Sequence, residues 1–161
     1  MTFSRPIFSL SLAAALLAAT AAQAQVSVQD AWVRATVPQQ KATGAFMQLT
    51  ATQDAQLLSV SSPVAAVAEI HEMTMDNGVM KMHAIPSLAL PAGKPVQLKP
   101  GSYHLMLLDL KAQVKDGDTV PVTLVFQGAD GKRQTLQVQA PARPLGAAMP
   151  AAAHEHNGVT H

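Results

Sequence analysis

Turn signals divide most of this chain into short segments in which apolar and polar residues tend to alternate. The clearest are Asp76-Asn77-Gly78, Lys99-Pro100-Gly101-Ser102, Asp116-Gly117-Asp118 and Ala129-Asp130-Gly131. Asn and Gly tolerate positive φ, and proline sets the φ of a turn, so each of these clusters reverses the chain for a physical reason. The segments between them, such as Val26-Ser27-Val28, favour strands over helices.

Short strands at this spacing predict an all-β sandwich or Greek-key barrel built as a single domain. The expected strands cover residues 26–28, 30–34, 44–49, 56–60, 69–75, 79–85, 96–98, 103–110, 119–126 and 134–140. One segment carries a helix signal instead. Ser61-Ser62-Pro63 offers a cap followed by a first-turn proline, which predicts one short helical turn over residues 63–68.

The ends of the chain differ in composition from the middle. Arg5 precedes an Ala/Leu-rich apolar run over residues 7–22, and Ala22-Gln23-Ala24 fits the small-x-small cleavage rule. We therefore predict a signal peptide over residues 1–24, and a mature periplasmic protein that begins at Gln25 without stable membrane insertion. The run is short and interrupted by serine, which argues against a retained anchor.

The folded domain is expected over residues 25–141, a length that can bury its own core. Residues 142–161 are Ala/Pro-rich and then His-rich, which predicts a flexible tail. The tail carries His154, His156 and His161. Imidazoles in such a segment predict a secondary Cu(II) site, and the alternative is a solvated end with incidental histidines.

Charge and cysteine content exclude several classes of function. The chain has 11 Lys and Arg against 10 Asp and Glu, a balance that argues against nucleic acid or an anionic membrane as main partner. A monomer is the default expectation for such a domain. The absence of cysteine excludes disulfides, thiolate metal sites and thiol catalysis. Soft-metal chemistry must therefore use methionine sulfur and histidine nitrogen.

Histidines and methionines gather between His71 and Met106. His104 and Met106 are two residues apart on an expected strand, so they point to the same face. The predicted hairpin over residues 69–85 brings its strands about 5 Å apart, so His71 and one methionine of the return strand can approach one ion. Thioethers bind Cu(I) well and hard cations poorly, while imidazole serves either copper state. This donor set predicts a Cu(I) site.

The alternative is a structural role, because methionines in strands commonly fill the core and single histidines are commonly satisfied polar residues. We assign Met47 to the core. Met73, Met75 and Met80 either belong to the core or form a soft rim that shields the site and passes the ion along. His83 has the opposite parity to the neighbouring methionine at position 82 and is expected to face away.

The spacing of these residues resembles a known ligand motif. His71, ten residues, Met82, twenty-one residues and then His104-x-Met106 is similar to the motif of the PCu(A)C family of periplasmic copper chaperones. Flanking segments extend the resemblance over about residues 28–140. They are Asp30-Ala31-Trp32-Val33-Arg34, Glu69-Ile70-His71-Glu72-Met73, Leu90-Pro91-Ala92-Gly93-Lys94, Lys99-Pro100-Gly101, Tyr103-His104-Leu105-Met106 and Gly117-Asp118-Thr119-Val120-Pro121.

The resemblance implies a cupredoxin-like β-barrel with an exposed Cu(I) site made of His71, Met82, His104 and Met106. It also implies delivery of copper to the binuclear copper centre of cytochrome c oxidase. The expected partner is then a copper-accepting oxidase subunit or another periplasmic copper carrier.

Two other functions would use the same metal. A periplasmic protein that buffers copper or silver without handing it on needs the same ligands, so the sequence leaves it open. A copper oxidase or monooxygenase is disfavoured, because a mature end at Gln25 cannot supply an N-terminal histidine brace. No Ser-His-Asp or paired-carboxylate arrangement can be recognised either. We therefore expect a binding protein and not an enzyme.

Overall fold

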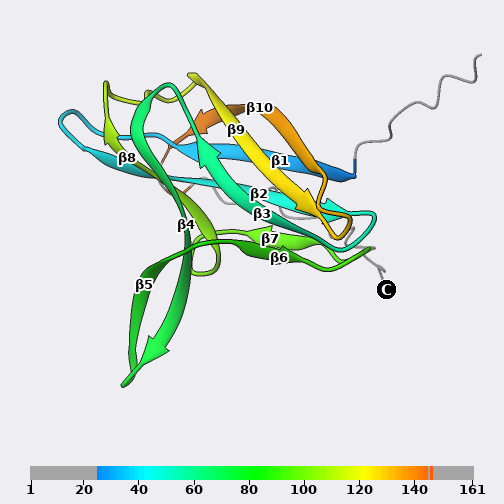
Figure 1. Ribbon diagram of the computed structural model, residues 1–161. Coiled ribbons are helices and arrows are strands. Elements are labelled where there is room, and N and C mark those ends of the chain that lie inside the picture. The colour runs from blue at the N-terminus through cyan, green and yellow to red at the C-terminus, as the bar shows by residue number, and fades with distance from the viewer. Residues whose placement is uncertain (1–24, 145, 147–161) are drawn as a thin grey trace, which may run out of the picture.

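The computed structural model describes residues 25–144 and Gly146, and every regular element in this part of the chain is a β-strand (Figure 1). The strands are β1 (Val26–Arg34), β2 (Ala42–Ala51), β3 (Ala55–Ser61), β4 (Ala65–Asp76), β5 (Val79–Ile85), β6 (Leu88–Leu90), β7 (Val96–Leu98), β8 (His104–Leu110), β9 (Thr119–Gly128) and β10 (Arg133–Arg143). The prediction of a single all-β domain is confirmed. Over the described residues, no helix is long and apolar enough to span a bilayer.

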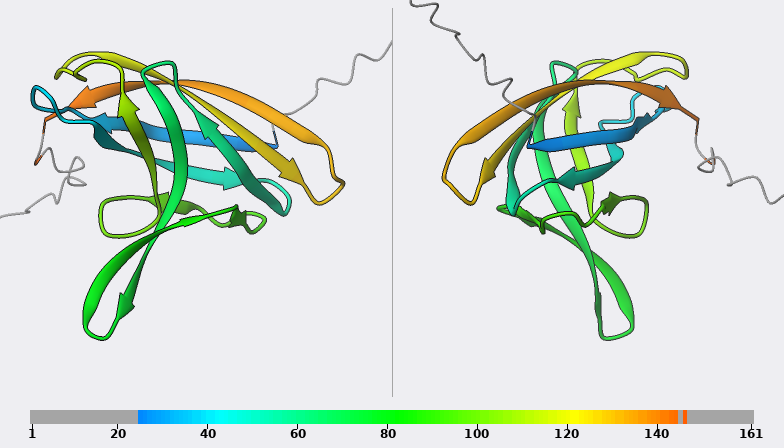
Figure 2. Two further views of the ribbon diagram at one scale, coloured as in Figure 1. Left: turned by 60° about the vertical axis from the view of Figure 1, so that its left-hand side comes forward. Right: turned by 90° about the vertical axis from the view of Figure 1, so that its right-hand side faces the viewer.

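The strands follow the order β5-β4-β8-β2-β1-β10-β9-β3-β6, and β7 is added beside β2. Neighbours pair antiparallel except β1 and β10, which run parallel where Val33 meets Ala142 and Arg34 meets Arg143. That parallel contact joins the half that ends in β5 to the half that ends in β6. Figures 1 and 2 show β9 and β10 arching over β1 and β2, so the halves form a sandwich.

The core lies between the two halves and is filled by the alternate residues that point inward from each strand. Its most buried large side chains include Leu49, Leu105, Leu107, Val122, Leu124 and Phe126. Each such side chain contributes about 1.5–3 kcal/mol on burial. Met47 is also buried in this core, as predicted. On β8, core residues alternate with His104 and Met106, which therefore point to the outer face.

The helical turn predicted over residues 63–68 is wrong, because β4 begins at Ala65. The Ser62 hydroxyl donates to the carbonyl oxygen of Pro121 on β9 at 2.6 Å. The Ala65 amide donates to the Ser62 carbonyl at 3.3 Å and closes a tight turn. Ala65 then pairs with Leu110 of β8. Ser62 thus ties the turn to a neighbouring strand instead of starting a helix.

The folded part of the chain extends past Pro141, where the domain was expected to end. Strand β10 continues to Arg143, since the Ala142 amide donates to the Asp118 carbonyl at 2.7 Å and Ala142 is buried. The predicted signal peptide lies outside the described residues. So does the tail at 145 and 147–161, with His154, His156 and His161.

The hairpin of β4 and β5 projects away from the sandwich (Figures 1 and 2). Its turn holds Asn77 at φ 49° and Gly78 at φ 78°. Positive φ at both central residues is typical of the tight turn that matches the twist of two antiparallel strands. Asp76 therefore pairs with Val79, and the predicted hairpin is confirmed.

Candidate metal centre

His71 and His104 are directly opposed on the neighbouring strands β4 and β8. Their ring centroids lie 5.7 Å apart, with the ring planes tilted by 60°. The adjacent residues Ile70 and Leu105 belong to the core, so the two imidazoles lie on the outer face of the sheet. Both residues are nevertheless shielded from water, at 8% and 6% exposure. The two histidines are therefore shielded from solvent although they lie on the sheet face opposite the hydrophobic core.

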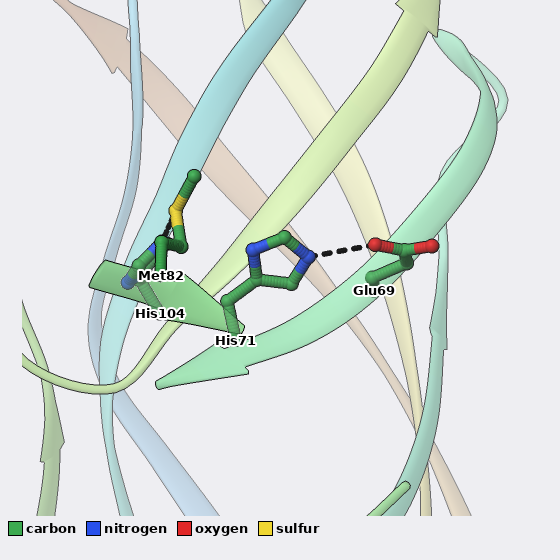
Figure 3. Close-up of polar contacts among 4 residues, drawn as sticks. All are labelled: Glu69, His71, Met82 and His104. Atoms are coloured by element: carbon green, nitrogen blue, oxygen red, sulfur yellow. Dashed lines mark hydrogen bonds and ion pairs between the residues drawn. The ribbon is translucent and has the colours of Figure 1, made fainter. Parts of the chain in front are cut away.

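Met82 approaches this pair from β5. Its Sδ atom lies 2.9 Å from Nε2 of His104 (Figure 3). On the same face, Met82 is opposite Met73 of β4. Met82 is 47% exposed, so its sulfur contacts a buried nitrogen while the side chain stays accessible from solution.

Met106 follows His104 by two residues on β8 and therefore shares its face. It is opposite Glu69 of β4 on one side and Gly44 of β2 on the other. Met73, Met82, His104 and Met106 all line one cavity of about 310 Å³. His71 stands opposite His104, next to that lining. The structure thus gathers the four sequence-predicted ligands on one face of β5, β4 and β8.

Hydrogen bonding fixes the ring nitrogens of His104. Its Nδ1 lies 2.8 Å from the carbonyl oxygen of Ser102, in the loop before β8. A carbonyl only accepts, so in the neutral ring Nδ1 carries the proton and donates it. Nε2 is then the nitrogen with a free lone pair, and it is the atom that faces the sulfur of Met82.

His71 is held in the same way through its other nitrogen. Its Nε2 donates to Oε2 of Glu69 at 2.6 Å, which leaves Nδ1 as the free nitrogen of the neutral ring. Nδ1 is buried and has no hydrogen-bond partner. In Figure 3 it lies on the side of the ring turned toward Met82 and His104. An unsatisfied buried nitrogen costs about 1–3 kcal/mol, and a bound metal ion would remove that cost.

Metal-binding histidines usually donate their second N–H to a carboxylate or a carbonyl, which fixes the tautomer and aims the free nitrogen. His71 uses the Glu69 carboxylate and His104 uses the Ser102 carbonyl. Sequence reasoning assigned no role to Glu69 or Ser102. The signal for Glu69 was its parity, since a residue two before His71 on the same strand shares its face.

Two aromatic rings, Phe46 of β2 and Trp32 of β1, form an aromatic wall beside His104. Phe46 lies 6.4 Å from His104 and 4.6 Å from Trp32 between ring centroids, and the Arg34 guanidinium lies 5.4 Å from the Phe46 centroid. Space for the Phe46 ring depends on Gly44, because a Cβ atom there would lie 2.6 Å from Cζ of Phe46. The wall was not predicted from the sequence.

The sequence left open whether Met73, Met75 and Met80 belong to the core or to a rim around the site, and the structure places them differently. Met73 is half-buried and lines the cavity. Met75 and Met80 are exposed, at 65% and 45%, and do not belong to the core. The prediction that His83 faces away is confirmed, because its Nε2 lies 2.7 Å from Oγ1 of Thr74 on the opposite face of the hairpin.

The sulfur donors that converge here are soft, and the imidazoles beside them bind either copper state. Within the described residues, no three His, Cys, Asp or Glu side chains come together as a metal-binding group. What does converge is a pair of imidazoles with a set of thioethers, and this combination suits Cu(I) far better than Zn(II), Mg(II) or Ca(II).

Relatives of known sequence cover most of the chain. The sequence model of a family described as "Putative lipoprotein LpqE-like" matches residues 26–142. A putative lipoprotein of Leifsonia xyli subsp. xyli (strain CTCB07) is 32% identical over 114 residues, which are 70% of this chain and 68% of the relative. A protein of Rickettsia prowazekii (strain Madrid E) is 34% identical over 123 residues, 73% of this chain and 68% of that protein.

Solved structures share the fold. The solution structure of Cu(I)-DR1885 from Deinococcus radiodurans is 34% identical with a TM-score of 0.59, covering 78% of this chain and 83% of that one. The copper-bound PCuAC domain from PmoF2 is 19% identical with a TM-score of 0.60, covering 75% and 94%. At 19% identity, the similarity to the PmoF2 domain shows a shared fold and nothing more. Together these structures confirm the expected cupredoxin-like sandwich.

Proposed function

This chain belongs to the LpqE-like family of putative lipoproteins, and from that premise we propose that it is a periplasmic Cu(I) carrier. His71, Met82, His104 and Met106 hold the ion, and the protein hands it on without turnover. The recipient is the binuclear copper centre of cytochrome c oxidase during its assembly. The signal peptide is cleaved before Gln25 as the chain is exported, and the carrier acts as a monomer.

The observation that carries the proposal is that two imidazole rings, each held through one nitrogen, turn the other nitrogen toward the side where Met82 lies. His104 Nε2 lies 2.9 Å from Met82 Sδ, and the unpartnered Nδ1 of His71 is turned to the same side. Each ring is locked through its other nitrogen, so the free lone pairs are oriented before the ion arrives. Such preorganisation lowers the entropy cost of binding.

Transfer, and not only storage, is favoured by the exposure and charge of the ligands. Met82 is half exposed, so an acceptor's own ligand can reach the ion while the histidines still hold it. Thioethers are neutral and release no proton when they leave. The ion can therefore be exchanged one ligand at a time, with its charge and oxidation state unchanged.

Two comparisons support the choice of metal and fold. The relative from Deinococcus radiodurans, 34% identical to this chain, was solved in a Cu(I) form and supports the metal. The PCuAC domain from PmoF2, 19% identical, supports the fold alone. The oxidase as recipient rests on the resemblance of the ligand spacing to the PCu(A)C motif. Because the sequence contains no cysteine, lipid attachment through cysteine is not part of the proposal.

The test is transfer of copper to the copper-binding domain of the oxidase subunit. The Cu(I)-loaded protein is mixed anaerobically with that apo domain, the two are separated, and copper is measured in each. We expect the ion to appear in the acceptor, and Met47→Leu to behave like the unmodified protein because Met47 is buried in the core. Copper retained by the loaded protein would contradict delivery and favour buffering. Oxygen consumption by the loaded protein would instead indicate an enzyme.

A further inference from the structure

The hairpin of β4 and β5 carries four methionines on one face. Met75 is opposite Met80, and Met73 is opposite Met82, so the four form two successive cross-strand pairs that we call the methionine ladder. The pair at the tip, Met75 and Met80, is the more remote from the sandwich. Figure 2 shows the tip projecting clear of the other described strands.

Packing does not account for the ladder. The opposite face of the hairpin is polar, with a hydrogen bond between Thr74 and His83 and an ion pair between Lys81 and Asp76. Both faces of the tip therefore meet solvent, and a strand in that position favours polar or β-branched residues. Met75 and Met80 are instead unbranched, apolar and exposed. What distinguishes methionine from other apolar residues is its polarizable sulfur.

The register suits the tip pair to one soft ion. Directly opposed residues in an antiparallel pair have Cβ atoms about 4.5–5.5 Å apart. Methionine has three rotatable bonds beyond Cα, so the sulfurs of Met75 and Met80 can converge on an ion between them. A set of thioethers alone selects Cu(I) and rejects hard cations. Lacking imidazole, it binds more weakly than a site with two histidines.

We propose that Met75 and Met80, with Met73 as a third sulfur, form a second Cu(I) site at the hairpin tip, from which the ion passes to the histidines. The next pair of the ladder is two residues along each strand, about 7 Å away. It contains Met82, whose sulfur contacts His104. Each step exchanges one neutral donor for another, thioether for thioether along the ladder and thioether for neutral imidazole at its end, so copper stays Cu(I) and no proton or electron moves. The inference rests on the proposed function for the identity of the ion.

The test uses the full mature chain, tail included, labelled with ¹³C in the methionine methyl groups. It is titrated with silver nitrate while the methyl signals are followed by NMR. Ag(I) has the same soft ligand preference as Cu(I) and does not change oxidation state. The first equivalent is expected to shift the methyl signals of Met82 and Met106. The second is expected to shift those of Met75 and Met80. The double variant M75L/M80L keeps the apolar surface, loses the second event and binds about one Ag(I) fewer.

Met47→Leu is the matched control, because it removes one buried sulfur and should leave both events in place. Histidines of the tail are common to all three proteins and cancel in the comparison. Unmoved signals from Met75 and Met80 at two equivalents would overturn the second site, as would an unchanged stoichiometry in M75L/M80L. If the tip signals move while those of Met82 and Met106 do not, the tip site stands and the proposed four-ligand site fails.

Discussion

Glu69 allows the orientation of His71 to be tested without replacing any of the proposed copper ligands. Its carboxylate accepts the Nε2 proton of His71 at 2.6 Å, and this contact is what leaves Nδ1 free on the side of Met82 and His104. Glu69→Ala removes the acceptor, so the ring of His71 can rotate or change tautomer. We expect Cu(I) affinity to fall while the fold stays intact.

The size of the loss follows from the exposure of the contact. Removing an outer partner of a metal-binding histidine typically costs 10–100-fold in metal affinity. The Glu69 side chain is 38% exposed, so water can partly replace the carboxylate and solvent screens its charge. We therefore expect the loss of Cu(I) affinity to lie at the lower end of this range, at about tenfold, which corresponds to about 1.4 kcal/mol of binding free energy. Glu69→Gln keeps an acceptor oxygen and should lose less than Glu69→Ala.

The assay is anaerobic competition for Cu(I) against a chromophoric chelator of known affinity. Glu72→Ala is the matched control, since Glu72 lies on the other face of β4 opposite His83 and should bind as tightly as the unmodified protein. Urea unfolding of each metal-free variant checks that the fold is unchanged. An affinity for Glu69→Ala equal to that of the control would refute the argument that Glu69 aims His71.

Three further changes test other parts of the structure. Met82→Leu should weaken Cu(I) binding but change stability by no more than about 0.5 kcal/mol, because the side chain is half exposed; unchanged affinity in the competition assay would remove Met82 from the site. Gly44→Ala should destabilise the fold by about 1–3 kcal/mol in urea unfolding, since the new Cβ lies 2.6 Å from the Phe46 ring; equal stability would mean that the ring moves aside freely. Deleting residues 145–161 should preserve Cu(I) affinity and lower the Cu(II) stoichiometry, and an unchanged stoichiometry would exclude the tail histidines as Cu(II) ligands.

Most of the strands were predictable because their limits are set locally, although β6 (Leu88–Leu90) was not among those expected. Turn residues such as Asn77 and Gly78 adopt the positive φ that a tight turn requires, whatever surrounds them. A turn with two central residues also fixes the register, so Asp76 must meet Val79 and Met73 must meet Met82. The turn at Ser62 was misread because its hydroxyl bonds to Pro121, which is remote in sequence.

The surroundings of the site were less predictable than its histidines. Spacing indicates which donors share a face, but not which partner each ring nitrogen has. The Ser102 carbonyl contacts His104 from only two residues earlier, and the contact depends on the conformation of the loop before β8, which residue spacing does not specify. Phe46 reaches His104 from a strand far away in sequence, across a glycine that leaves it room. The contact of Phe46 with His104 depends on how strands are paired in space, which local patterns do not specify.

The most direct test is X-ray absorption at the copper edge of the protein loaded with one equivalent of Cu(I). If His71, Met82, His104 and Met106 hold the ion, the spectrum will contain both imidazole nitrogen and thioether sulfur in the first shell. The sulfur contribution will fall in Met82→Leu and stay unchanged in Met47→Leu. A first shell of nitrogen and oxygen alone, or of sulfur alone, would contradict the site.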